Sequence, residues 1–282
     1  HREAAGTDPL VHLDLVKIPP VRSGLIGLLS QNLILMGIFF TVPLYLQMVL
    51  GLDALETGIR MLPVSVMMFL AAAAGARLSG RFSVRSIVRS GLVITGVSSI
   101  ILLATIDPEL NERGFAIAMG ALGLGMGLLA SQLGNVVQSS VDASGRSEAG
   151  GLQFTGQQLG SSLGIALVGA VVLSSLTSVF LSNVGSNPAI SDKLESQVSV
   201  AAGTGVDFVS TDQIEAAAQD AGLSDAETTA LVTDYEDAQL QSLKLGLLLA
   251  AFLALGSLLF TRDLPRTVPP SEVEATAAIG AT

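Results

Sequence analysis

The chain has 282 residues, of which 50% are hydrophobic and 13% are charged, with a net charge of −10 and a mean hydropathy of +0.63. An average soluble domain is about 25% charged, so this composition excludes an ordinary water-soluble protein and predicts a polytopic membrane protein. The chain has no cysteine, which excludes disulfides, thiolate metal sites and cysteine nucleophiles.

Residues 1–21 are polar, contain three prolines and begin at His1 instead of Met. They lack the basic start, apolar core and small-residue cleavage site of a signal peptide. We therefore expect this segment to be a cytoplasmic linker in a chain cut from a longer protein.

Six apolar stretches follow, and a helix that spans a bilayer needs about 20 mostly apolar residues. Five stretches have that length directly, and the second has it if it runs from Thr57 to Leu78. The sequence therefore predicts an all-α integral membrane protein with six transmembrane helices, five in residues 22–181 and the sixth in 241–262. The stretches are Gly24–Tyr45, Met61–Ala76, Ile87–Ile106, Phe115–Val137, Leu152–Leu176 and Leu243–Phe260.

Lysine and arginine are enriched in the cytoplasmic segments that flank spans. With the N-terminus inside, ten of these residues fall on the inner side and four on the outer side. This asymmetry predicts a multi-pass protein of the cell (inner) membrane with both termini cytoplasmic. The inner residues are Arg2, Lys17, Arg22, Arg77, Arg81, Arg85, Arg89, Arg146, Arg262 and Arg266, and the outer ones are Arg60, Arg113, Lys193 and Lys244.

The segment 182–240 is acidic and lies on the outer side in this topology. Ser210–Gln213 and Ser224–Glu227 both fit the capping box that begins a helix. We expect two short helices here, the second running into the last span. The acidity fits either attraction of cationic substrates or a solvated surface. Residues 263–282, rich in Pro, Ala, Glu and Thr, are predicted to form a disordered cytoplasmic tail.

Glycines recur at four-residue spacing in the fourth and fifth spans, which lets helices approach closely in lipid. The run at 123–127 does not follow a strand and lacks the spacing of a dinucleotide-binding loop. These glycines therefore predict helix packing. They are Gly123, Gly127, Gly156, Gly160 and Gly164.

Amide side chains within spans are costly unless they are hydrogen-bonded, so their clustering in the inner parts of three spans is informative. One interpretation is a wall of a cavity that binds substrate and water, and the other is hydrogen bonding between helices. The cavity candidates are Gln31, Asn32, Gln132, Asn135, Gln153 and Gln157.

The first span also places Met36 and Phe39 near Asn32 on one broad face. An aromatic and a methionine beside an amide fit an adaptable apolar pocket, and they equally fit lipid contact or packing. Pro43 and Pro63 flank the first outer turn, where they either kink gating helices or are tolerated near helix ends.

Three segments carry a family resemblance: VPLYLQMVLGLDALETGIRMLPVSV (42–66), ARLSGRFSVRS (76–86) and AGGLQFTGQQLGSSLGIALVGAV (149–171). They resemble the C-terminal half of a major facilitator superfamily transporter, in the fourteen-span drug:proton antiporter branch. Arg81 and Arg85 match the basic positions of the superfamily's inner loop, whereas Gly80 stands at its acidic position. The copy is degenerate, so the gating role of this loop stays open.

This resemblance implies one half-bundle of a transporter that exports amphipathic or cationic small molecules by proton-coupled alternating access. Its partners would be the missing N-terminal half, the lipid bilayer and the substrate. No acidic residue lies well inside a span, so no proton relay is expected within these six spans.

Two alternatives belong to other classes. A self-contained six-span scaffold or a dimerising half-transporter stays open. An enzyme is not expected, because the two histidines, His1 and His12, lie outside the spans and no acid–base or nucleophile cluster is present. The sequence predicts no cofactor, no metal and no nucleic-acid partner.

Overall fold

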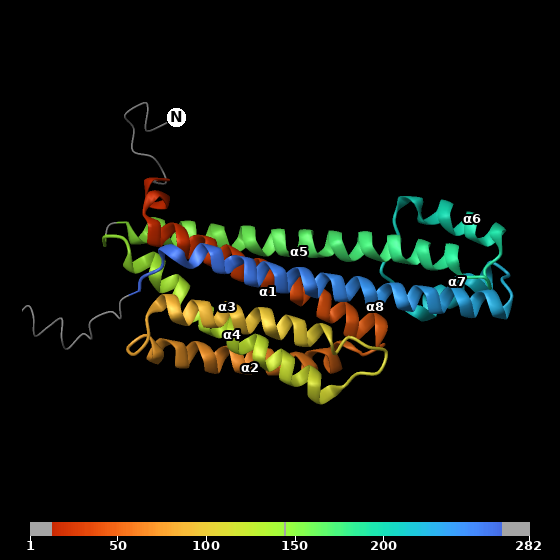
Figure 1. Ribbon diagram of the computed structural model, residues 1–282, viewed down its shortest axis with the longest axis horizontal. Helices are drawn as coiled ribbons and strands as arrows, with labels where there is room; N and C mark the ends of the chain where they lie inside the picture. Colours follow the sequence, from red (N-terminus) through yellow and green to blue (C-terminus); the bar gives the residue numbers. More distant parts are fainter. Residues whose placement is uncertain (1–12, 144, 267–282) are drawn as a thin grey trace, which may run out of the picture.

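The structure is a computed structural model that describes residues 13–143 and 145–266, which are helical throughout apart from short turns (Figure 1). Six helices are long and apolar enough to cross a membrane, which confirms the predicted fold class. The expectations for residues 1–12 and 267–282 lie outside the described residues. The elements are the 3-10 turn Leu13–Lys17, α1 (Pro19–Leu44), the π-helical turn Tyr45–Val49, α2 (Ala54–Leu78), α3 (Val84–Leu103), α4 (Glu112–Ser139), α5 (Arg146–Ser186), α6 (Asp192–Ala201), α7 (Thr211–Asp220), α8 (Asp225–Gly256) and the 3-10 helix Ser257–Asp263.

The six long helices run side by side along the long axis of the molecule (Figure 1). The most extensive contacts pair α2 with α4 and α1 with α5, while α3 packs against both α4 and α8. Each of the first three long helices therefore packs mainly against the last three, α4, α5 and α8. We call the end that carries α6 and α7 the outer end, and the opposite end, where α3 begins, the inner end.

Glycines allow the two main pairs to pack backbone against backbone. A Cβ atom at Gly123 or Gly127 of α4 would overlap the carbonyl oxygens of Val64 or Met68 in α2. At Gly160 and Gly164 of α5 it would overlap the carbonyl oxygens of Leu29 and Leu33 in α1, whereas at Gly156 it would lie 3.7 Å from the Leu25 oxygen. The residues predicted for helix packing thus lie at the two most extensive helix–helix contacts, and four of the five lie where the backbones approach too closely for a Cβ atom.

The outer end of α1 changes to a π-helical turn at Tyr45, two residues after Pro43. Tyr45 in this turn is fully buried, and its hydroxyl donates to the carbonyl oxygen of Asp107 at 2.6 Å. The turn therefore anchors α1 to the connection between α3 and α4.

An outer domain projects beyond the bundle, formed by the extended ends of α5 and α8 together with α6 and α7 (Figure 1). It has its own apolar cluster, which includes Phe180, Leu194 and Tyr235. Three helical segments occur here instead of the expected two, because α6 also forms. The Ser224 capping box is present at the start of α8, whereas Ser210 precedes α7 without a side-chain cap bond.

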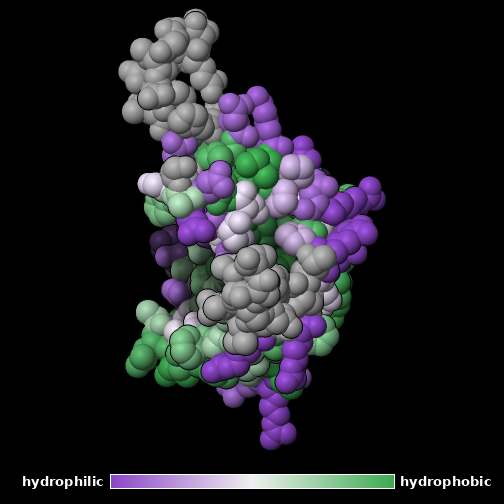
Figure 2. All heavy atoms as spheres, turned by 90° about the vertical axis from the view of Figure 1, so that its left-hand side faces the viewer, coloured by the Kyte–Doolittle hydropathy of each residue, from purple (hydrophilic) through white to green (hydrophobic). Residues whose placement is uncertain are grey.

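The outside of the bundle is apolar. Large side chains such as Phe69, Ile117 and Phe252 are 74%, 68% and 72% exposed. Hydrophilic side chains instead gather at the inner end, which Figure 2 views end-on. This distribution is the one that a lipid-embedded bundle requires.

Candidate functional site

Two of the six candidate amides link helices in the bundle interior. The Nε2 atom of Gln31 in α1 donates to the carbonyl oxygen of Met126 in α4 at 3.3 Å. The Nε2 atom of Gln132 in α4 donates to the carbonyl oxygen of Gly75 in α2 at 2.9 Å. Both residues are at most 5% exposed. At these two positions the geometry is that of interhelical hydrogen bonding.

The other four amides lie nearer the surface of the bundle. Asn135 is exposed, and Asn32, Gln153 and Gln157 are half-buried. Asn32 donates from Nδ2 to the carbonyl oxygen of Leu28 within its own helix, at 2.9 Å. These side chains are therefore not used to join one helix to another through hydrogen bonds that the structure describes.

These four amides come from three helices that meet in the inner half of the bundle. Gln153 of α5 reaches α4, where a Cβ atom at Gly134 would lie 2.9 Å from its Nε2 atom. Leu133 of α4 in turn lies against Gly27 of α1. We call Asn32, Asn135, Gln153 and Gln157 the amide wall.

The amide wall contains an acceptor without a donor. The Oε1 atom of Gln153 is buried and has no hydrogen-bond partner among the described residues. The same is true of the Oε1 atom of Gln132 in α4. A buried acceptor left unpaired costs about 1–3 kcal/mol. The Gln153 oxygen can recover that energy by accepting a hydrogen bond from water or from an N–H group of a ligand.

Apolar residues continue the wall towards the outer end. Met36 and Phe39 follow Asn32 at helical spacing in α1, are half-buried and pack partly against the main core cluster. A rise of roughly 1.5 Å per residue places Phe39 about 10 Å farther along the axis than Asn32. The surface is thus polar in its inner half and apolar beyond it.

Two of the long helices, α2 and α5, are poorly covered by the rest of the bundle. Only 17% of the most apolar window of α2 is buried, against 50% for α3 and α4. Exposed residues of α2 include Leu62, Val66 and Phe69, and those of α5 include Phe154 and Leu163.

The four gating or inner-loop candidates are dispersed. Pro43 lies at the outer end of α1, and Pro63 is half-buried within α2. Arg81 is exposed in the turn between α2 and α3, and Arg85 lies in the first turn of α3.

Sequence reasoning missed two outer-end contacts. One is the Tyr45 hydroxyl described above, and the other is an ion pair at 3.0 Å between Arg60 of α2 and Glu112 of α4. A tyrosine and an arginine next to an outer turn were the available signals, but their partners depend on the tertiary packing.

The model of one protein family, the Major Facilitator Superfamily, matches residues 2–165, more than half of the chain. The chain belongs to the major facilitator superfamily. The match covers α1 to α4 and the inner half of α5, and so includes all of the amide wall.

Several members of the superfamily are similar to the chain. A tetracenomycin C resistance and export protein of Streptomyces glaucescens is 29% identical over 64% of the chain and 33% of its own length. The multidrug efflux pump LfrA of Mycolicibacterium smegmatis is 26% identical over 65% of the chain and 35% of its own length. A probable actinorhodin transporter of Streptomyces coelicolor is 28% identical over 63% of the chain and 31% of its own length. The chain thus spans about a third of the length of these relatives.

Proposed function

We propose that this chain is one half of a secondary transporter that exports amphipathic or cationic small molecules. The similarity to proteins named for drug efflux, resistance and export supports this proposal. So does the amide wall, whose Gln153 oxygen is a buried acceptor without a donor. That oxygen is the observation on which the proposal chiefly rests.

The wall suits a ligand with a polar head and an apolar body. Gln153 and Gln157 offer amide oxygens to an ammonium or N–H group, while Met36 and Phe39 offer adaptable apolar contact. Transport then follows from rocking of this half against an N-terminal half, which opens the wall to each side in turn. The uncovered faces of α2 and α5 are where that half would pack.

Coupling to protons belongs to the other half in this proposal. In the described spans, the carboxylates of α4 and α5 lie near the helix ends, as Glu112 and Glu148 do, and those inside α8, such as Asp237, lie in its part that belongs to the outer domain. The protein would lie in the cell membrane with both termini cytoplasmic. The membrane segments would be 22–181 and 241–262, with 182–240 outside.

The test compares two neighbouring glutamines in a complete transporter that contains both halves. Gln157 is half-buried on the wall, whereas Gln158 is exposed on the same helix. We expect Gln157→Leu to change efflux of at least one cationic compound by about tenfold, as the loss of one hydrogen bond to a charged group does. Gln158→Leu should leave the efflux profile unchanged.

Efflux is measured with a panel of cationic and neutral dyes, and the amount of folded transporter by size-exclusion chromatography. A Gln157→Leu variant that folds normally and exports every compound at the normal rate would contradict the proposal. The same holds if both variants change the profile alike.

A further inference from the structure

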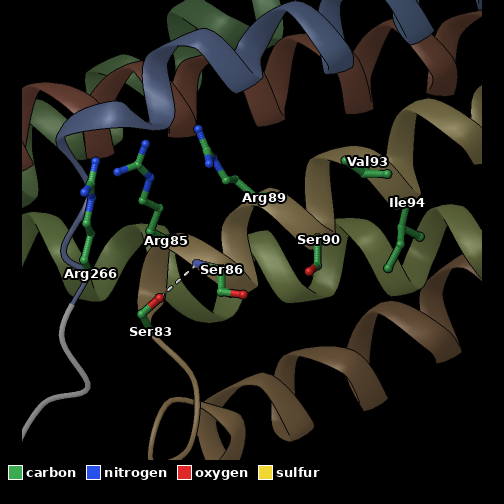
Figure 3. Close-up of a pocket in the computed structure, with 8 residues that line it drawn as sticks. All are labelled: Ser83, Arg85, Ser86, Arg89, Ser90, Val93, Ile94 and Arg266. Atoms are coloured by element: carbon green, nitrogen blue, oxygen red, sulfur yellow. Dashed lines mark hydrogen bonds between the residues drawn. The ribbon is translucent and has the colours of Figure 1, made fainter.

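A cavity of about 750 Å³ opens at the inner end of α3. Its basic lining comes from Arg85 and Arg89 of α3 and from Arg266, which follows the last 3-10 helix. Figure 3 shows the three guanidinium groups side by side and directed the same way, towards the ribbon at the end of α8. Ser86 and Ser90 line the same space. We call it the arginine pocket.

The positive charge of this pocket is not neutralised by its lining, which includes no carboxylate among the described residues. The nearby Asp263 carboxylate instead forms an ion pair with Arg22 at 3.0 Å. The Nε atom of Arg85 is buried without a hydrogen-bond partner. Since this atom is a donor on a cation, an anion is the kind of partner that would satisfy it best.

Two further features fix how an anion would be held. The Nε atom of Arg89 donates to the Thr261 hydroxyl at 2.9 Å, which orients its guanidinium group and leaves the terminal nitrogens available. The pocket also lies at the N-terminus of α3, where the helix dipole favours negative charge.

The exposed face of α3 changes character along its length. Ser86, Arg89 and Ser90 are exposed at the inner end, and Val93 and Val97 continue the same face with 42% and 47% exposure. The helix therefore offers donors for one or two turns and then an apolar strip. An anionic phospholipid has the same division between its headgroup and its acyl chains.

We propose that the arginine pocket binds the phosphate of an anionic phospholipid, with one acyl chain along Val93 and Val97. Arg85, Arg89 and Arg266 hold the phosphate diester, and the serine hydroxyls donate to its free oxygens. Inorganic phosphate shares the charge and the acceptor oxygens but lacks the acyl chain. The apolar strip is the reason for choosing the lipid.

The experiment measures lipid binding by native mass spectrometry of the purified full-length protein in a neutral detergent. The probes are dioctanoyl phosphatidylglycerol, dioctanoyl phosphatidylcholine and inorganic phosphate. We expect the phosphatidylglycerol to bind about tenfold more tightly than the phosphatidylcholine, because two or three basic groups near an anionic headgroup give at least that factor. Inorganic phosphate should bind weakly.

The test variant is a double variant of the pocket that combines Arg89→Gln and Arg266→Gln. Its matched control is a double variant that combines Arg77→Gln and Arg81→Gln. Both lose two charges at the inner end, and Arg77 and Arg81 do not line the pocket. The test variant should lose the preference for phosphatidylglycerol, and the control should keep it. The single variant Arg266→Gln, in an exposed residue beyond the helices, weakens binding without disturbing the bundle.

Equal loss in both double variants would overturn the proposal, because the preference would then reflect general surface charge. Inorganic phosphate that binds as tightly as the lipid would also overturn it, and the pocket would be a site for a soluble anion. Binding is measured without transport, so failure here is distinguishable from failure of the export proposal.

Discussion

The six-helix bundle and the outer domain share two continuous helices, α5 and α8, but they expose opposite kinds of surface. The bundle exposes Phe154 and Phe252, whereas the outer domain buries Phe180 and Tyr235 and exposes charge. Residues 182–240 contain eleven of the 24 carboxylates and one of the 14 basic residues. The net charge of −10 therefore resides entirely in this segment.

The exposed surface changes from charged and polar to apolar within a few residues of α8. Its exposed positions include Asp237 and Gln241 on the outer side and Leu245, Leu248 and Phe252 farther in. From Lys244 to Arg262 the helix rises roughly 30 Å, at about 1.5 Å per α-helical and 2.0 Å per 3-10 residue. That length equals the hydrocarbon thickness of a bilayer, so the surface changes where a membrane boundary would lie.

The two regions are also held together differently, and the largest predicted effect follows from this difference. The bundle depends on backbone contact at glycines, so the side chain of Gly160→Leu in α5 would overlap the Leu29 carbonyl group and force α1 away from α5. We expect a loss of stability of about 3 kcal/mol, the upper end of the usual range for over-packing, and with it much of the folded protein. Folded protein is measured by size-exclusion chromatography and thermal unfolding in detergent.

Gly150→Leu is the matched control, because nothing lies within 4 Å of a Cβ atom at this position in the same helix. It should leave the unfolding temperature nearly unchanged. A Gly160→Leu protein as stable as this control would show that the close approach of α1 and α5 is not required.

The outer domain depends instead on a buried aromatic side chain, as in a water-soluble protein. Tyr235 is fully buried, its ring meets that of Phe180 edge-on at 5.4 Å, and its hydroxyl donates to the carbonyl oxygen of Asp207 at 2.8 Å. Tyr235→Ala should cost about 3–5 kcal/mol within the outer domain. We expect faster hydrogen exchange in α6 and α7 but not in α1.

Hydrogen exchange with mass spectrometry measures both regions in one experiment. Thr233→Ala, an exposed position on the same helix, is the control. If Tyr235→Ala increased exchange in α1 as much as in α7, the two regions would unfold as one unit and the comparison would fail.

The fold was predictable from the sequence because lipid requires long apolar segments, and six of them are present. The start of α8 was also predicted, from the Ser224 capping box, but the outer end of α5 was not, since an apolar run marks only the part of a helix in lipid. Both helices continue beyond it into the outer domain, where polar and apolar residues alternate. α6 was missed because it is short and polar, and because Leu194 instead of Glu or Gln stands three residues after Ser191, so the capping-box pattern is absent.

The candidate site was predictable as a set of residue types but not as a geometry. The inner clustering of amides was visible in the sequence, but whether Gln31 bonds to Met126 or faces a cavity depends on the rotation of α1. Arg266 lies far from Arg85 in sequence, so only the packing of the last helix against α3 brings the two together.

The smallest predicted effect concerns two serines that have the same sequence pattern. The Ser224 hydroxyl accepts a hydrogen bond from the Glu227 backbone N–H, and the Glu227 carboxylate accepts one from the Ser224 backbone N–H. Ser210 makes no such side-chain bond at the start of α7. Loss of a cap costs about 1 kcal/mol, so Ser224→Ala should destabilise the first turn of α8 by this amount.

Ser210→Ala should be close to neutral, which makes it the matched control for a motif that is present in sequence and absent in structure. Hydrogen exchange at residues 225–230 and 211–216 measures the two effects separately. Equal effects at both sites would mean that the pattern alone determines the cap. An effect at Ser224 alone would agree with the structure, in which the Ser191 hydroxyl also donates to the Glu227 carboxylate at the start of α8.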